Sequence, residues 1–222
     1  MIKTLLTLTT FFISNLLFAA QSEGYSGSNI FEAIKKRDVN MVKGILKTKP
    51  NLEIKNNKGQ TPLMQAVYEK DNEIAFLLVD AGASVNTQDD ILNSPFLYAG
   101  AEGNLDFVKK ALKHGARFDI YNRFGGTALI PAAEKGHLDI VKLLVNTPNF
   151  PKDHINKLGW TALLEAVILS DGDKVHTDIV QALVDGGVDV NIKDKDGISA
   201  LQHARNKNYT GMIKILEKAG VK

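Results

Sequence analysis

The chain has 222 residues and a formal net charge of +2. With 44% hydrophobic residues it can bury a sizeable core, and its 23% charged residues are normal for a globular protein. It contains no cysteine, which excludes disulfides, thiolate zinc sites, a cysteine nucleophile and lipidation of an N-terminal cysteine. The charge is nearly balanced, and no Lys/Arg-rich block is interleaved with aromatic residues, so the electrostatic footprint of a nucleic-acid-binding protein is absent from the sequence.

Residues 1–22 have the pattern of a secretory signal peptide. Lys3 gives a positive start, residues 5–18 form an apolar run broken by a few Thr, Ser and Asn residues, and two alanines follow. An uncleaved membrane anchor is the alternative, but the run is short and interrupted, whereas a spanning helix needs about 20 apolar residues. We therefore expect export to the periplasm or secretion, a short linker over residues 23–27, and no stable membrane insertion after cleavage.

A three-residue pattern recurs along the rest of the chain: Ser or Thr, then Pro or Ala, then Leu or Phe. The copies at Thr61, Ser94 and Thr127 start 33 residues apart, and those at Thr161 and Ser199 follow after 34 and 38 residues. A weaker copy precedes them, and an alanine follows each copy at the same distance. This periodicity predicts one repeat domain over 28–222, with repeats near 28–60, 61–93, 94–126, 127–160, 161–198 and 199–222.

Each copy predicts a pair of short helices. The Ser or Thr hydroxyl caps the free amides of a first helix, and Gly103 and Gly136 end that helix where a positive backbone angle is needed. An apolar stripe then predicts a second helix, as at residues 74–79. Glycines follow the second helices, and polar, turn-prone segments such as 86–93 join the units.

These residues resemble the ankyrin repeat family. Its motif runs Thr-Pro-Leu-His-x-Ala-Ala-x-x-Gly-His and continues into a second helix that ends in Ala-Gly-Ala-x-Val-Asn; residues 61–66, 81–86 and 136–144 match it closely. The resemblance implies an all-α ankyrin-repeat solenoid of about six helix-turn-helix repeats with inter-repeat β-turn fingers. With the signal pattern, it indicates an exported, periplasmic-type bacterial ankyrin-repeat protein.

Departures from the motif indicate where the repeats should differ. Arg37 and Lys70 stand where a glycine usually ends the first helix, which leaves the turn geometry there open. Pro148 and Pro151 predict that the second helix of the fourth repeat ends early. About five extra residues around 170–176 predict a longer loop between the two helices of the fifth repeat.

Signatures of catalysis, metal binding and cofactor binding are missing from the sequence. The five histidines form no pair at metal-ligand spacing, the Asp-rich segments lack the remaining ligands of a calcium loop, and no nucleophile elbow, P-loop or dinucleotide fingerprint occurs. We therefore expect no catalytic residue, metal or cofactor. A hydrolase that uses Asp173 and His176 of the fifth repeat is a weaker alternative.

The resemblance places binding on the concave surface formed by the fingers and the exposed side of the first helices. Because exposed apolar side chains on one face favour an interface, and because this surface becomes apolar toward its middle and C-terminal part, we expect a partner protein to bind there. The alternative is that Phe124 and Trp160 pack against neighbouring fingers and stiffen the array. The candidate partner-binding residues are Tyr68, Ile91, Arg123, Phe124, Lys157, Leu158, Trp160, Ile168 and Leu169.

The predicted function is a monomeric, non-catalytic protein-interaction module outside the cytoplasm. A secreted effector that binds a host protein is the alternative, since both would combine an export signal with ankyrin repeats. Some exported bacterial ankyrin proteins of this size are associated with catalase or oxidative-stress defence, so the resemblance makes such an enzyme one candidate partner.

Overall fold

The computed structural model describes residues 27–220, so the predicted signal peptide lies outside the described residues. Twelve α-helices and no strand make up the regular structure of this part of the chain, and none of these helices is long and apolar enough to cross a membrane. The helices belong to two compact units, which divide between Ala83 and Ser84.

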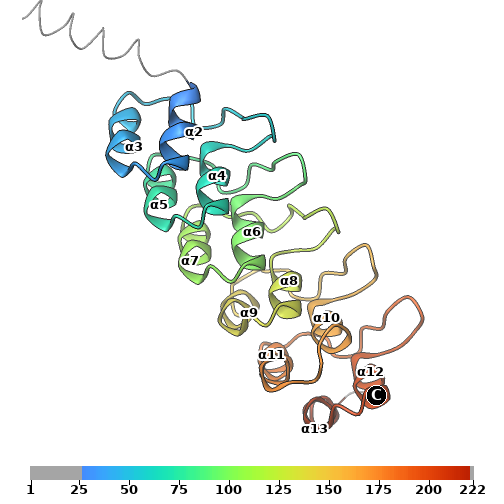
Figure 1. The fold of residues 1–222 in the computed structure, drawn as a ribbon. Helices are drawn as coiled ribbons and strands as arrows, with labels where there is room; N and C mark the ends of the chain where they lie inside the picture. Colours follow the sequence, from blue (N-terminus) through green and yellow to red (C-terminus); the bar gives the residue numbers. More distant parts are fainter. Residues whose placement is uncertain (1–26, 221–222) are drawn as a thin grey trace, which may run out of the picture. The chain divides into compact units, whose positions relative to one another are not determined.

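The first unit contains two helix pairs. Its first helices α2 and α4 pack together, as do its second helices α3 and α5, and a long loop connects α3 to α4 (Figure 1). Ile34, Leu63, Ile74 and Leu78 are fully buried between the helices, and for Ile74 and Leu78 this is what the apolar stripe predicts. The bounds are α2 Gly27–Lys35, α3 Val39–Leu46, α4 Pro62–Tyr68 and α5 Asn72–Asp80.

The second unit contains four helix pairs in two layers. The first helices α6, α8, α10 and α12 pack in succession, and so do the second helices α7, α9, α11 and α13. Figure 1 shows that the long finger loops project from the side of the first helices, away from the second helices. The bounds are α6 Pro95–Ala101, α7 Leu105–Lys113, α8 Leu129–Glu134, α9 Leu138–Val145, α10 Ala162–Ile168, α11 Lys174–Asp185, α12 Ala200–Asn206 and α13 Thr210–Lys218.

The predicted Ser/Thr caps form at four of the five first helices from α4 to α12. Thr61, Ser94, Thr161 and Ser199 each accept a hydrogen bond from the backbone N–H three residues later. The prediction is wrong at Thr127, because α8 begins only at Leu129, with no side-chain cap, and the Thr127 hydroxyl is buried without a hydrogen-bond partner.

Pro131 explains the late start of α8. In the four first helices that have a Ser/Thr cap, the residue four positions after the cap donates its backbone N–H to the carbonyl of the cap residue, as Glu165 does to Thr161 at 3.0 Å. Pro131 stands four positions after Thr127 and has no N–H to donate. The first hydrogen bond of the helix is therefore missing.

The turns after the first helices keep one geometry whether or not glycine is present. Gly103 and Gly136 have φ angles of 74° and 82°, as predicted, and Arg37 and Lys70 have φ angles of 54° and 55°. A side chain at a left-handed position costs about 1–2 kcal/mol. The repeat architecture therefore holds Arg37 and Lys70 in this conformation despite the local cost.

The fourth repeat shows the predicted early end of its second helix, and the fifth repeat accommodates its insertion differently from the prediction. Helix α9 ends at Val145, ahead of Pro148, as expected. The insertion only partly lengthens the loop: residues 169–173 connect α10 to α11, and the rest extends α11 to 12 residues. Residues 174–176 are helical because Asp173 caps α11, its carboxylate accepting from the backbone N–H of His176 at 2.9 Å.

Candidate functional site

Each finger is closed by the side chain of its first residue. Asn156 Oδ1 accepts the backbone N–H of Leu158 at 3.0 Å and of Trp160 at 3.1 Å, while Asn156 N donates to Trp160 O. Such Asx turns replace missing backbone hydrogen bonds in tight loops. The other four fingers repeat the arrangement from Asn56, Asp89, Asn122 and Asp194.

The third residue of each finger lies at its tip, and three of these residues in the second unit are apolar. The exposed fractions of Ile91, Phe124 and Leu158 are 53%, 51% and 49%, and Leu169, directly after α10, is 47% exposed. All four are among the predicted partner-binding residues. Large apolar side chains left half in water are the usual mark of a binding surface when they gather.

Leu92 is a further tip residue, which the sequence analysis missed. Its position is occupied by Gly59, Gly125, Gly159 and Gly197 in the other fingers, all with positive φ, and Leu92 also has a φ of 60°. It is 43% exposed beside Ile91. The signal was present in the sequence, because the alignment of the five fingers shows leucine at a glycine position.

One cavity joins several predicted residues on two fingers and two helices. It has a volume of about 140 Å³, and it lies among the fingers 122–126 and 156–160 and the helices α8 and α10. Phe124, Leu158 and Leu169 line it, as do two carboxylates, Glu134 and Glu165. The full lining is Asn122, Phe124, Ile130, Pro131, Glu134, Asn156, Leu158, Glu165 and Leu169; we call this the acidic cavity.

Glu165 is the least expected member of the acidic cavity. Its side chain lies in α10 and is only 5% exposed, and Asn156 Nδ2 donates a hydrogen bond of 2.7 Å to Glu165 Oε1. Burial, together with the nearby charge of Glu134, raises the pKa of Glu165 to about 7, even though the hydrogen bond from Asn156 acts to lower it. A carboxyl group that titrates near neutrality therefore lies in the cavity.

A second cavity of about 280 Å³ lies beside the first and shares Phe124 and Glu134 with it. The guanidinium of Arg123 lies over the Phe124 ring, with 4.6 Å between its carbon and the ring centroid. Lys135 Nζ contacts Glu102 Oε1 at 2.8 Å. This hollow therefore contains both signs of charge, whereas the acidic cavity has only negative charge.

The remaining predicted partner-binding residues do not line the acidic cavity. Lys157 is exposed, and its Nζ donates to Arg123 O at 2.9 Å, which links two neighbouring fingers. Trp160 and Ile168 are half-buried and do not line the acidic cavity. Tyr68, half-buried at the end of α4, belongs to the first unit. The second unit thus brings Arg123, Phe124, Lys157, Leu158 and Leu169 into one neighbourhood.

Asp173 and His176, the residues of the hydrolase alternative, are bound into the repeat. His176 Nδ1 is 2.6 Å from Asp173 Oδ2, and His176 Nε2 is 2.9 Å from Glu134 O. Both ring nitrogens are engaged, so neither is left to act as a general base. The pair instead connects α11 to the end of α8. No group of three or more metal-ligating side chains occurs within residues 27–220.

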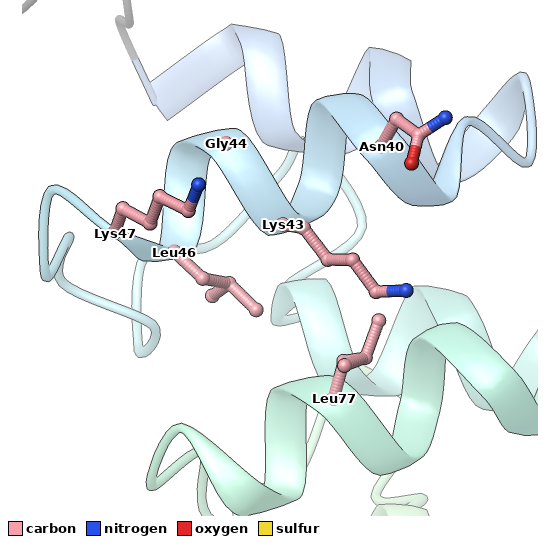
Figure 2. Close-up of a pocket in the computed structure, with 6 residues that line it drawn as sticks. All are labelled: Asn40, Lys43, Gly44, Leu46, Lys47 and Leu77. Carbon is pink, nitrogen blue, oxygen red and sulfur yellow. The ribbon is translucent and has the colours of Figure 1, made fainter.

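A hollow in the first unit lies between α3 and α5, on the side of the second helices. It measures about 550 Å³ and is lined by Asn40, Lys43, Gly44, Leu46, Lys47 and Leu77 (Figure 2). Lys43 Nζ is 3.9 Å from Glu73 Oε1, and the amines of Lys43 and Lys47 do not converge on one point (Figure 2). Since every lining residue is at least partly exposed, this hollow lacks the buried polar group that fixes a ligand.

Paired helices with Asx-closed fingers define a helical repeat protein, and comparison with known proteins identifies the class. The family profile of ankyrin repeats (three copies) matches residues 13–89 and 96–194. The chain belongs to the ankyrin repeat family. Ankyrin repeat domains are generally protein–protein interaction modules and typically non-enzymatic scaffolds, so the coarse functional expectation agrees with the family.

Individual proteins similar to this chain extend the comparison. It is 33% identical to the ankyrin repeat protein YahD of Escherichia coli K12 over 188 residues, which cover 85% of this chain and 94% of YahD. The crystal structure of an ankyrin repeat domain from Acinetobacter baumannii AYE superposes with a TM-score of 0.84 at 44% identity, covering 87% of this chain and 98% of that domain. The ankyrin repeat domain of Bcl-3, an IkappaB-family protein, gives a TM-score of 0.77 at 25% identity over 90% of this chain and 88% of its own. These matches confirm the predicted fold class.

Proposed function

We propose that this protein is a non-catalytic binding module, exported from the cytoplasm, that binds another protein through the fingers and first helices of its second unit. The observation that carries the proposal is the set of half-exposed apolar tips, Ile91, Phe124 and Leu158, two of which border the acidic cavity. A partner that covers these tips removes apolar surface from water, which contributes roughly 25 cal/mol per Å² buried.

The ordered backbone of the finger turns also supports a binding role for this surface. The tips stand on turns whose closing hydrogen bonds come from the side chain of the first finger residue, and Lys157 N donates to Phe124 O at 2.9 Å, which joins two fingers through the backbone. A turn whose backbone is already ordered loses little conformational freedom on binding. Phe124 and Leu158 are thus suited to act as anchors for a partner.

Affinity capture with matched variants tests the site. The mature protein would be used as bait, with Phe124→Ala plus Leu158→Ala as the site variant and Val175→Ala as the control, because Val175 is similarly exposed but lies on the second helix α11. The proposal predicts a partner that is lost on the double substitution and kept on the control. Equal capture by all three proteins would remove the site assignment.

Export is a separate part of the proposal, supported by the signal pattern of residues 1–22. Cell fractionation tests it: retention inside the outer membrane favours a resident periplasmic protein, and appearance in the culture medium favours an effector that binds a host protein. A cytoplasmic, uncleaved chain would contradict both. A catalase or another enzyme of oxidative-stress defence is one partner to look for among the captured proteins.

A further inference from the structure

We propose that the acidic cavity of the second unit takes a lysine or arginine side chain of the partner protein, which enters between the Phe124 and Leu158 tips. The inference rests on the proposed function and specifies the chemistry of the partner. Five apolar residues, Phe124, Ile130, Pro131, Leu158 and Leu169, line the cavity together with the carboxylates of Glu134 and Glu165. A basic side chain, with an apolar stem and a charged head, has the complementary make-up.

The negative charge of the cavity is not balanced by the surrounding protein. The carboxylate of Glu134 makes no ion pair or hydrogen bond with any residue in the described part of the chain, and Glu165 has one oxygen engaged by Asn156. None of the residues that line the cavity is basic. Two neighbouring carboxylates without a cation are unfavourable together, so a cation from outside relieves their repulsion.

The basic residues nearby have other partners. Lys157 Nζ donates to Arg123 O at 2.9 Å, Lys135 Nζ contacts Glu102 at 2.8 Å, and the Arg123 guanidinium lies over the Phe124 ring. Neutralising the cavity from within would require breaking one of these contacts. A cation for the cavity would therefore come from the partner.

The size of the cavity favours a side chain over other occupants. A volume of about 140 Å³ exceeds the space needed by a single water but is below the roughly 300–1,000 Å³ of typical small-molecule sites. A hard divalent metal ion normally takes at least six oxygen ligands, and the cavity offers two carboxylates. A neutral apolar side chain would bury Glu134 and Glu165 without a counter-charge, which is costly.

Nuclear magnetic resonance titration of the ¹⁵N-labelled mature protein tests this inference with three small probes. Butylguanidinium and butylammonium represent the arginine and lysine side chains, and butylurea is the neutral isostere. We expect saturable shifts of the Asn156 side-chain amide and of the backbone amides of Leu158 and Glu165 with the two cations, and roughly tenfold weaker binding of butylurea.

Substitutions locate the effect. Glu134→Gln and Glu165→Gln should each weaken cation binding several-fold, whereas Asp139→Asn, which removes one charge from the exposed start of α9, should leave it unchanged. The inference is overturned if no cation shifts these amides at about 50 mM, if butylurea binds equally well, or if neither glutamine variant weakens binding. Because no partner is needed, such a failure leaves the proposed function standing, provided that capture still depends on Phe124 and Leu158. If the cations bind but capture does not depend on Phe124 and Leu158, the proposed function fails and the cavity keeps only its preference for cations.

Discussion

Asn156 links a finger to the first helix α10. Its Oδ1 closes the finger, and its Nδ2 donates a hydrogen bond of 2.7 Å to Glu165 Oε1. The same amide thus fixes the Leu158 tip and holds the buried carboxyl of α10. Loss of the Asn156 side chain therefore removes both the bonds that close the finger and the bond to Glu165.

Stability should depend on pH through Glu165. The pKa of its carboxyl is raised from 4.5 to about 7 in the folded protein. Below pH 4.5 the group is protonated in both states, and above about pH 7 it is ionised in both, so the free energy of unfolding falls as the pH rises between these values. The fall should be about 3 kcal/mol at most, from 1.36 kcal/mol per pKa unit.

Urea denaturation of the wild type and of Glu165→Gln between pH 4 and 8 measures this effect. The difference between the two proteins isolates the contribution of Glu165: the glutamine variant should gain stability relative to the wild type as the pH rises. A difference that stays constant over this range would contradict the raised pKa.

Asn156→Ala should destabilise the protein more than the matched substitution Asn122→Ala. Both remove the two hydrogen bonds that close a finger, but only Asn156→Ala also leaves Glu165 without its hydrogen bond. A hydrogen bond to a charged group contributes about 1.5–3 kcal/mol. We therefore expect Asn156→Ala to lower the free energy of unfolding at pH 8 by about that much more than Asn122→Ala does. Equal unfolding free energies for the two variants would show that the bond to Glu165 contributes nothing.

Leu92→Gly should raise stability and weaken partner binding. Glycine relieves the left-handed strain at φ 60°, and after allowance for the greater freedom of glycine in the unfolded chain we expect a gain of about 0.5–1 kcal/mol. The exposed tip is lost at the same time. Gly197→Ala is the inverse control, since its φ is 74° with no neighbour within 4 Å of an added Cβ, and it should lose stability. Thermal unfolding and affinity capture give the two readouts.

Thr127→Val should be neutral or stabilising by up to about 1 kcal/mol. The Thr127 hydroxyl is buried without a partner, so replacing it by a methyl group removes an unsatisfied polar atom at nearly constant volume. Thr161→Val is the matched comparison: its hydroxyl caps α10 by accepting from Leu164 N at 3.2 Å, and its loss should cost about 1 kcal/mol. Chemical denaturation should show an unchanged or higher free energy of unfolding for Thr127→Val and a lower one for Thr161→Val. A larger loss of stability for Thr127→Val than for Thr161→Val would contradict the prediction.

The local features were predictable because their causes lie within a few residues. The helix pairs, four Ser/Thr caps and the left-handed glycines follow from capping and periodicity in each repeat. Thr127 was mispredicted because the proline four residues later removes a donor that the four capped first helices use. The insertion in the fifth repeat was placed wholly in a loop because the capping role of Asp173 was overlooked.

The acidic cavity was not predictable in the same way. Glu165 follows Leu164 and precedes Ala166 in a strongly apolar stretch, where a charged residue could equally point to solvent. Only the packing of α10 on α8 brings it near Glu134, and only the return of the finger brings Asn156 to it. The exposure of Phe124 and Leu158 was predictable because exposure at a finger tip depends on the repeat register alone.

The finger design separates the shape of a loop from the identity of its tip. Oδ1 of each closing side chain accepts the backbone N–H of the third finger residue and makes no use of that residue's side chain, so any residue with an N–H can occupy the third position and still make this bond. The five fingers carry Lys58, Ile91, Phe124, Leu158 and Asp196 there. Tip residues can therefore be substituted one at a time while the turns keep their hydrogen bonds, so the binding surface can be redesigned finger by finger.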